Sequence, residues 1–534
     1  MQNHSLVLLL GLSLMITLPV YSKDVPKGSY QLSCSNISVS DDALTATCKK
    51  LNDVSQSTTL TQLGFCLNSI SHYGDIGNID GNLVCLPDLP KPDPNFVFPQ
   101  SETVLNQWIY GGDLNQIYQH GWGIWSGLTQ QVGTVDGTVV RAFETWTVPS
   151  NIIFRSATEN ASLHAVNAPL KRPSLELSVP RQFGHGKTTA QAKVQTKAMM
   201  SVKDVAAAAA TGAPDSNIFV SVAYNPPGAE HAIANRLFYE STLQQYMKNG
   251  YAEIPNFPNN SITIKPVYKI ISKTVPNGIY TFPGWPGPNP PDPKKGFGES
   301  IWNSCVYVDI STPSGPGGNS NDPGCKNKTA ANTFYLNNFI HNKISSDNAA
   351  YLTNQLGISV SEGDYIILVA MHVTTREDKV WTWQTFWWSA NADQPFAPSS
   401  TAIASARPLS YLDEAAKHYA MSVAYAMVEP PQPIAGGKNV GNSVYGYNPY
   451  LEAGFGPDTF GISRPINGKI NNTTGIQTNC MTCHNMAAYV PKPKSGMPYA
   501  SDFYISISDS VFNGTLKTDF SWTILNTLVP TPTK

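Results

Sequence analysis

Eight cysteines, grouped into four close pairs, constrain the fold of this 534-residue chain more than any other feature of its sequence. Three of the pairs lie outside any recognisable reactive motif, and proximity favours a disulfide within each of them. The sequence alone does not fix this connectivity. The expected disulfides are Cys34–Cys48, Cys66–Cys85 and Cys305–Cys325. Such bonds persist in oxidising compartments, so the grouping favours an exported protein.

The fourth pair lies in Cys480-Met481-Thr482-Cys483-His484, which has the C-x-x-C-H spacing of a covalent haem c attachment site. In such a site both thiols form thioethers with the haem, and the histidine binds the iron. One helical turn brings the three side chains to one side. A C-x-x-C disulfide and a zinc half-site are the alternatives, but zinc would need two further ligands. We therefore expect one covalent haem c per chain, held by Cys480, Cys483 and His484.

The sixth iron ligand is less constrained by the sequence. Met497, which follows His484 by 13 residues, is the first candidate. His418 and Met421 are two others, because we expect a helix over 410–427 that would place them on one face. A methionine or histidine ligand would favour electron transfer, whereas an open position would permit ligand or peroxide chemistry.

The N-terminus has the pattern of an export signal. Residues 5–20 form an apolar stretch without charge, and residues 1–22 are expected to be a signal peptide cleaved after Ser22. The stretch is too short to span a bilayer comfortably, and we expect no membrane span elsewhere. Because bacteria attach haem c after export, the expected location is the periplasm, the outer surface or the medium of a Gram-negative bacterium.

The charge balance excludes one class of partner. The chain has 35 Lys and Arg against 37 Asp and Glu, a formal net charge of −2, so it lacks the basic excess of nucleic-acid-binding proteins. Only 13% of its residues are charged, about half of the usual ~25%. Aromatic residues make up 10% of the chain, which argues against disorder.

Residues 28–85 have the pattern of a small β module. Apolar and polar residues alternate over 37–40 and 43–47, which is typical of short half-buried strands. An Asx/Gly turn over 78–81 precedes a last strand. The order GSYQLSC, ISVS, ALTATC and GNIDGNLVC resembles the cyanovirin-N homology family.

This resemblance implies a β lectin module over 23–86 that binds an oligosaccharide of the mannose type. Asn78 and Asp80 match polar turn residues that bind sugar hydroxyls in the family, and Ser33 offers a further hydroxyl. The alternative is that Asn78 and Asp80 only hold the turn. Members of the family typically contain two repeats, whereas this chain contains one equivalent.

A Pro-rich linker is expected over 87–99, followed by a large α+β domain over 100–534. Helices are expected within 101–119. Strands are expected at 217–222, 261–265 and 364–369. The tryptophan-rich segment 381–388 could form core, a sugar-stacking surface or a wall of a haem pocket.

The order of WTWQTFWW at 381–388, an expected helix, a long loop and then the C-x-x-C-H segment resembles that of uncharacterised exported monohaem c-type cytochrome proteins of bacteria. The expected fold class is therefore multidomain: a small all-β cyanovirin-like module and a large α+β domain with a C-terminal haem c attachment helix. The expected function is electron transfer or haem-dependent oxidoreduction with a redox partner at a glycan-rich surface. The alternative is a secreted or surface mannose-type lectin whose haem is structural or absent, and no catalytic residue is assigned.

Overall fold

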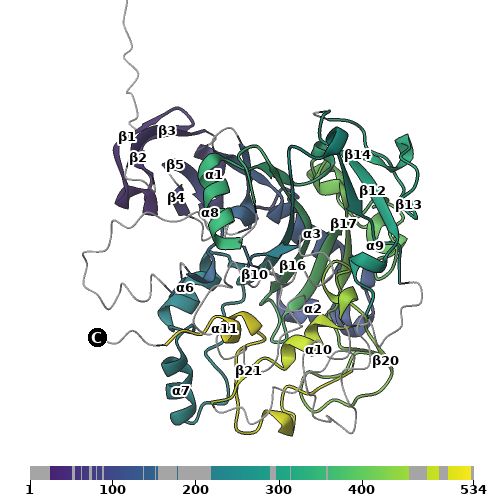
Figure 1. Cartoon of the computed structure of the whole chain (residues 1–534). Coiled ribbons are helices and arrows are strands. Elements are labelled where there is room, and N and C mark those ends of the chain that lie inside the picture. Colours follow the sequence, from purple (N-terminus) through teal and green to yellow (C-terminus); the bar gives the residue numbers. More distant parts are fainter. Residues whose placement is uncertain are drawn as a thin grey trace, which may run out of the picture.

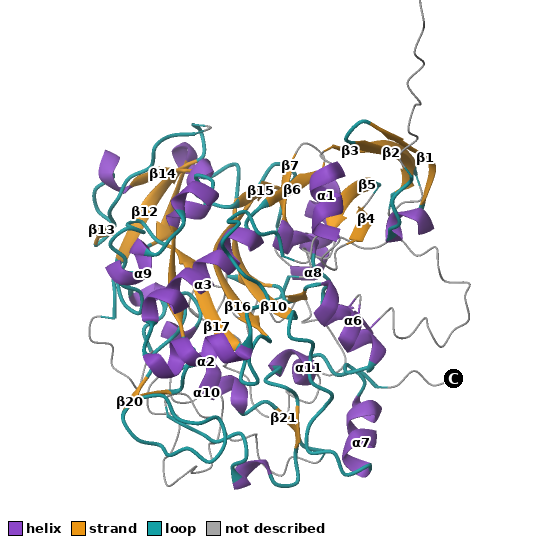
Figure 2. Cartoon of the chain, turned by 180° about the vertical axis from the view of Figure 1, so that it is seen from behind, coloured by secondary structure: helices purple, strands orange, loops and turns teal. Residues whose placement is uncertain are grey.

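The chain folds into a small all-β N-terminal region and a larger α+β region, as the sequence predicts (Figures 1 and 2). The computed structural model describes residues 24–50, 54–61, 63–70, 75–79, 81–86, 89–135, 138–150, 152–153, 177–178, 218–288, 296–312, 314–356, 359–455, 478–491 and 503–530. The proposed signal peptide over 1–22 lies outside these residues. Among the described residues, no helix has the length and apolar character needed to cross a bilayer.

The N-terminal region is a three-stranded antiparallel sheet followed by a helix and a hairpin. The sheet contains β1 (Cys34–Ser40), β2 (Ala43–Lys49) and β3 (Ser55–Thr61), and α1 (Leu63–Ile70) leads to β4 (Asp75–Ile79) and β5 (Asn82–Leu86). Leu44, Ala46 and Cys48 of β2 are buried and alternate with more exposed residues, which is the period expected for a half-buried strand. Two of the predicted disulfides, Cys34–Cys48 and Cys66–Cys85, hold this thin core together.

The larger region is built on a seven-stranded sheet. Its main path runs β18-β17-β16-β10-β8, with β15 also paired to β16 and β9 also paired to β10. The members are β8 (Phe219–Val220), β9 (Ala223–Tyr224), β10 (Ile262–Ile271), β15 (His341–Lys343), β16 (Tyr365–Thr375), β17 (Thr382–Trp388) and β18 (Tyr419–Val423). These strands include parts of all three segments in which strands are predicted. All residues of β17 are buried, so both sheet faces are covered at this strand.

The helix pair α2 (Glu102–Gly111) and α3 (Leu114–Leu128) lies against one face of this sheet. Trp125 of α3 stacks on Phe386 of β17, with ring centroids 4.4 Å apart. The opposite face is covered by the C-terminal part of the chain, where α10 (Cys480–Asn485) contacts β17. The sheet therefore separates α3 from the predicted haem attachment helix.

A second sheet carries the third predicted disulfide. Strand β12 (Ser304–Asp309) pairs with β11 (Ile279–Pro283), β13 (Asp322–Pro323) and β14 (Thr333–Tyr335), and Cys305–Cys325 closes the loop between β12 and the residues after β13. The remaining helices are α6 (Pro226–Ala234), α7 (Glu240–Lys248), α8 (Ser346–Leu356), α9 (Thr401–Ser405) and α11 (Trp522–Asn526). The remaining strands are β6 (Gln131–Val135), β7 (Thr138–Arg141), β19 (Val428–Glu429), β20 (Asn442–Ser443), β21 (Ala488–Tyr489) and β22 (Leu516–Lys517).

The predicted helix over 410–427 is wrong. Its first part forms two short 3-10 turns, and its centre is strand β18, which pairs with β17. Asp413 accepts a hydrogen bond from the Ala416 N–H at 2.9 Å and pairs with Arg141 at 2.7 Å, which stabilises the turn conformation rather than a helix start. Pairing with the aromatic strand β17 overrides the local helical pattern.

Part of the predicted linker packs against the larger region. Leu89 and Phe98 are buried in the same hydrophobic cluster as Trp122 and Trp125 of α3. Gly127 of α3 permits this contact, because a Cβ atom there would clash with the backbone carbonyl of Pro90. Residues 89–99 therefore follow a fixed path over α3.

Candidate functional site

The C-x-x-C-H segment forms the short helix α10, which begins at Cys480. Asn479 caps this helix, because its side-chain oxygen accepts a hydrogen bond from the Thr482 N–H at 3.0 Å. The side-chain amide of Asn479 also donates to the carbonyl groups of Ala426 and Val444. The start of α10 is therefore held by hydrogen bonds to two segments, one just before β19 and one just after β20.

The three predicted haem-attachment residues share one face of α10, because they stand three and four residues apart on a helix. Cys480 and Cys483 are not joined to each other or to another cysteine. The Cys480 thiol donates to the Gly446 carbonyl at 3.1 Å, and burial raises the pKa of this thiol well above its ordinary value. The two thiols therefore stand as neighbours on one side of the helix, without a disulfide between them.

His484 is held in one tautomer by a backbone carbonyl. Its Nδ1 atom lies 2.8 Å from the carbonyl oxygen of Phe520. Because a carbonyl only accepts hydrogen bonds, Nδ1 carries the proton and the neutral ring leaves its lone pair on Nε2. This is the arrangement found in histidines that bind a metal through Nε2.

The carbonyl that orients His484 belongs to a strained turn. Asp519 and Phe520 have φ values of +45° and +65°, a region that residues other than glycine rarely occupy. The Asp519 carboxylate accepts hydrogen bonds from Arg376 at 3.1 Å, from the Trp381 indole at 3.1 Å and from the Phe257 N–H at 2.9 Å. These contacts hold the turn in its unusual conformation.

The ring of Trp383 covers one side of His484, with ring centroids 4.3 Å apart. Burial lowers the pKa of His484 to about 4, and the positive charges of His372 and Lys265 act in the same direction. Lys265 and His372 are paired across β10 and β16, one row away from Trp383. His372 in turn contacts Glu452 at 2.9 Å, so a charged row lies beside the attachment helix.

The hairpin loop between β16 and β17 contains three consecutive buried charged residues, Arg376, Glu377 and Asp378. Arg376 reaches the C-terminal turn through Asp519. Glu377 reaches the opposite side of the sheet, where it contacts His120 of α3 at 3.1 Å. The loop thereby connects the layers on the two faces of the sheet.

The two candidates for the sixth ligand that the structure describes, His418 and Met421, are not brought to His484. Met497 lies outside the described residues. Met421 is fully buried on β18 opposite Phe386, which faces α3, whereas Trp383 and His484 lie on the other face of the sheet. His418 stacks near Trp388 within the same α3-facing core.

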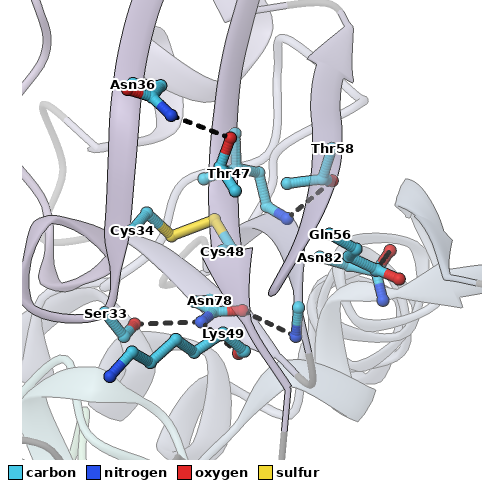
Figure 3. The surroundings of a disulfide bond; sticks show 12 residues. Ser33, Cys34, Asn36, Thr47, Cys48, Lys49, Gln56, Thr58, Asn78 and Asn82 are labelled. Atoms are coloured by element: carbon cyan, nitrogen blue, oxygen red, sulfur yellow. Dashed lines mark hydrogen bonds between the residues drawn. A yellow bond between two sulfur atoms is a disulfide. The ribbon is translucent and has the colours of Figure 1, made fainter. Parts of the chain in front are cut away.

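In the N-terminal region, Asn78 is 5% exposed and serves the local fold (Figure 3). Its amide group donates to the Ser33 hydroxyl and to the Lys49 carbonyl, both at 2.9 Å, and its oxygen accepts from the Gly81 N–H at 2.9 Å. The side chain therefore has no amide hydrogen left for a sugar. Asp80 lies outside the described residues.

The residues of α10 fit a covalently attached haem in two respects: two unbridged thiols share a face with His484, and the histidine has the tautomer that binds iron. Among the described residues, no three His, Cys, Asp or Glu side chains are grouped as a metal site. Searches with the sequence and the structure match no family model, no curated protein and no solved structure.

Sequence reasoning missed the residues that support α10. Asp519 and Phe520 lie more than thirty residues from His484, and no local motif marks them. The run of charges at 376–378 is a weak indication of a structural role, because it interrupts two strongly apolar segments in a chain of low charge. A solvated hairpin is the ordinary interpretation of such a run, and only the structure shows that it is buried.

Proposed function

We propose that this protein is an exported c-type haem protein that carries one haem on Cys480, Cys483 and His484 and transfers electrons to or from a redox partner. The observation that carries the proposal is the hydrogen bond from His484 Nδ1 to the Phe520 carbonyl, because it leaves Nε2 for iron on the same helix face as two thiols. Export is supported by the three disulfides.

A bound haem would supply one-electron chemistry at the iron. The chain would contribute attachment through the two thiols and a fixed imidazole orientation. Trp383 would limit rotation of that imidazole by its contact with the ring. Lys265 would place positive charge close to the group, which stabilises a reduced and therefore more negative centre.

The test is covalent haem in the full-length protein, expressed with a bacterial haem c maturation system. We expect a pyridine haemochrome spectrum with one haem per chain that survives acid–acetone extraction. Cys480→Ser with Cys483→Ser should abolish covalent attachment. His418→Ala is the matched control, since His418 lies on the other side of the sheet, and it should leave the stoichiometry unchanged. Wild-type protein without covalent haem under these conditions would refute the proposal.

The second candidate function is binding of a mannose-type oligosaccharide by the N-terminal region. The supporting observation is the outer face of the β1–β3 sheet, where Ser38, Thr45 and Thr59 form a cross-strand row of hydroxyl groups. The Thr45 and Thr59 hydroxyls lie 2.9 Å apart on the exposed side. Such a row offers donors and acceptors to sugar hydroxyls without charge.

A mannose-type glycan array with the full chain tests this second function. Thr45→Val with Thr59→Val should lower the signal at least tenfold, because valine keeps the side-chain shape and removes the hydroxyl. Thr274→Val is the control, since it removes an exposed hydroxyl of a comparable Ser272–Thr274 pair in the larger region. Absence of binding by the wild type would exclude the lectin function and leave the haem proposal untouched.

A further inference from the structure

A small cavity beside the turn at Phe520 is lined mainly by cationic side chains. Its volume is about 70 Å³. The segment after α7, the β16–β17 loop and the chain around β22 meet here, although they are distant in sequence. The charged residues of the lining are Arg376, Lys379, Lys517 and Glu253. Three cations against one carboxylate is an unusual grouping in a chain in which only 13% of the residues are charged.

The guanidinium group of Arg376 is fixed on one side by the protein. Its Nε atom lies 3.1 Å from the Asp519 carboxylate, and its Nη1 atom donates to the Asp378 carbonyl at 2.9 Å. Among the described residues, Nη2 of Arg376 has no acceptor. Because two of its nitrogens are already held, Arg376 offers the third as a donor whose position costs little to organise.

Lys517 is fixed beside Glu253 by the backbone. Its N–H donates to the Ala252 carbonyl at 2.9 Å, and its carbonyl accepts from the Ile254 N–H at 3.0 Å. The ammonium group donates to the Ile507 carbonyl at 3.2 Å and lies 3.6 Å from the Glu253 carboxylate. An ammonium group has three hydrogens, so these two contacts leave one for an occupant of the cavity.

Glu253 is the carboxylate of the lining, and it would repel an anion that carries no hydrogen. Burial raises the pKa of its carboxyl group. Lys379 is exposed, and its contact with Glu102 is long, at 3.9 Å, so its ammonium group adds positive charge at the edge of the cavity. The lining has an excess of positive charge even when Asp519, which lies behind Arg376, is counted with Glu253.

These contacts distinguish between small oxyanions. Lysine and arginine bind phosphate and sulfate oxygens equally by charge-assisted hydrogen bonds. A carboxylate, in contrast, only accepts hydrogen bonds. Inorganic phosphate retains a hydrogen at neutral pH and can donate it to Glu253, whereas sulfate has none to donate.

We propose that this cavity binds inorganic phosphate, with Arg376, Lys379 and Lys517 as donors to its oxygens and Glu253 as the acceptor of its hydrogen. The volume suits a free anion of this size. The site uses none of the haem-attachment residues, so its test does not require haem.

Inorganic phosphate and sulfate are titrated separately into the full-length protein by isothermal titration calorimetry at constant ionic strength. We expect saturable binding of phosphate, at least tenfold tighter than that of sulfate. Lys379→Gln should weaken phosphate binding several-fold. Lys326→Gln is the matched control, because it removes an exposed lysine outside the lining and should change the affinity less than twofold.

Glu253→Gln tests the discrimination between the two anions. Removal of the carboxylate should bring the affinities for phosphate and sulfate within about threefold of each other, mainly because sulfate binds more tightly. Lys379 is exposed, so Lys379→Gln keeps the test decisive if Glu253→Gln folds poorly.

The proposal is overturned if phosphate does not bind, if sulfate binds the wild type equally tightly, or if Lys379→Gln leaves phosphate binding unchanged. A wild-type protein that binds phosphate without carrying haem would support this site and contradict only the haem function. A haem-bearing protein that does not bind phosphate would overturn this site alone.

Discussion

The imidazole Nδ1 of His484 lies 2.8 Å from the carbonyl oxygen of Phe520, and this contact connects the attachment helix to a turn that has no sequence motif of its own. The turn is held through Asp519, which receives hydrogen bonds from Arg376 and Trp381 of the β16–β17 loop. The orientation of His484 therefore depends on a loop that is more than one hundred residues away in the chain.

We predict that Asp519→Ala lowers the free energy of unfolding by about 3–5 kcal/mol, because it leaves the Arg376 guanidinium buried without its partner. Urea denaturation of the full chain measures this change. Lys379→Ala is the control: its pair with Glu102 is exposed, at 3.9 Å, and should contribute at most about 1 kcal/mol. Equal effects of the two substitutions would contradict the role of Asp519.

In the haem-loaded protein, Asp519→Asn should also change the iron environment, because it loosens the turn that presents the Phe520 carbonyl to His484. We expect a shifted midpoint potential and altered Soret position at unchanged haem stoichiometry. A stability loss without any spectroscopic or potential change would show that Asp519 supports only the fold.

The pH dependence of the free energy of unfolding should show the raised pKa of the Asp378 carboxyl group. Burial raises the pKa of its carboxyl group to about 6 in the folded protein, above its value in the unfolded chain. The folded state then binds more protons than the unfolded state between about pH 4 and 6, so this group makes the free energy of unfolding fall as pH rises through that window. A tenfold change in proton affinity corresponds to about 1.4 kcal/mol, so the total decrease is roughly 2–3 kcal/mol.

Asp378→Asn should remove this decrease and be more stable than the wild type at pH 7 by a similar amount. Denaturation curves between pH 4 and 7.5 provide the measurement. Glu362→Gln removes an exposed carboxylate that does not act on Asp378, so it should retain the wild-type profile. A profile of Asp378→Asn parallel to that of the wild type would show that Asp378 titrates normally.

Local features of the sequence were sufficient to predict the disulfides and three of the seven strands of the central sheet, β8, β10 and β16. Cys34, Cys48, Cys66 and Cys85 are close in sequence, so short loops bring them together. The strand at Tyr365–Thr375 has an uninterrupted apolar run that only a covered sheet can bury. Such elements depend on neighbouring residues, and their prediction needs no knowledge of the distant chain.

The surroundings of α10 could not be predicted in this way, because they depend on distant pairing. Local propensity predicts a helix that would place His418 and Met421 on one face. Pairing of β18 with β17 instead places Met421 on the face of the sheet that is covered by α3. Likewise, the charge of Arg376 is stabilised by Asp519, which lies 143 residues further along the chain. No spacing rule connects two residues so far apart.

We predict that replacing both Cys34 and Cys48 by alanine destabilises the N-terminal region by about 3 kcal/mol in the chain-entropy account, since the bond closes a loop of 14 residues. Hydrogen exchange of the full chain should show lost protection in β1–β3 and retained protection in β10 and β16. Simultaneous loss in both sets of strands would indicate that the N-terminal region and the large sheet unfold as one unit.

A substitution at one glycine of α3 tests whether residues 89–99 pack closely against this helix. Gly127→Ala should lower the free energy of unfolding by about 1–3 kcal/mol, because the new methyl group would collide with the backbone of Pro90 and the side chain of Leu89. Gly111→Ala on α2 is the matched control: its methyl group would meet no atom within 4 Å, so the better helix former should stabilise the protein by up to about 1 kcal/mol. Limited proteolysis should detect cleavage within 89–99 only in Gly127→Ala. If Gly127→Ala is as stable as the wild type and equally resistant, then this segment does not depend on close contact with α3.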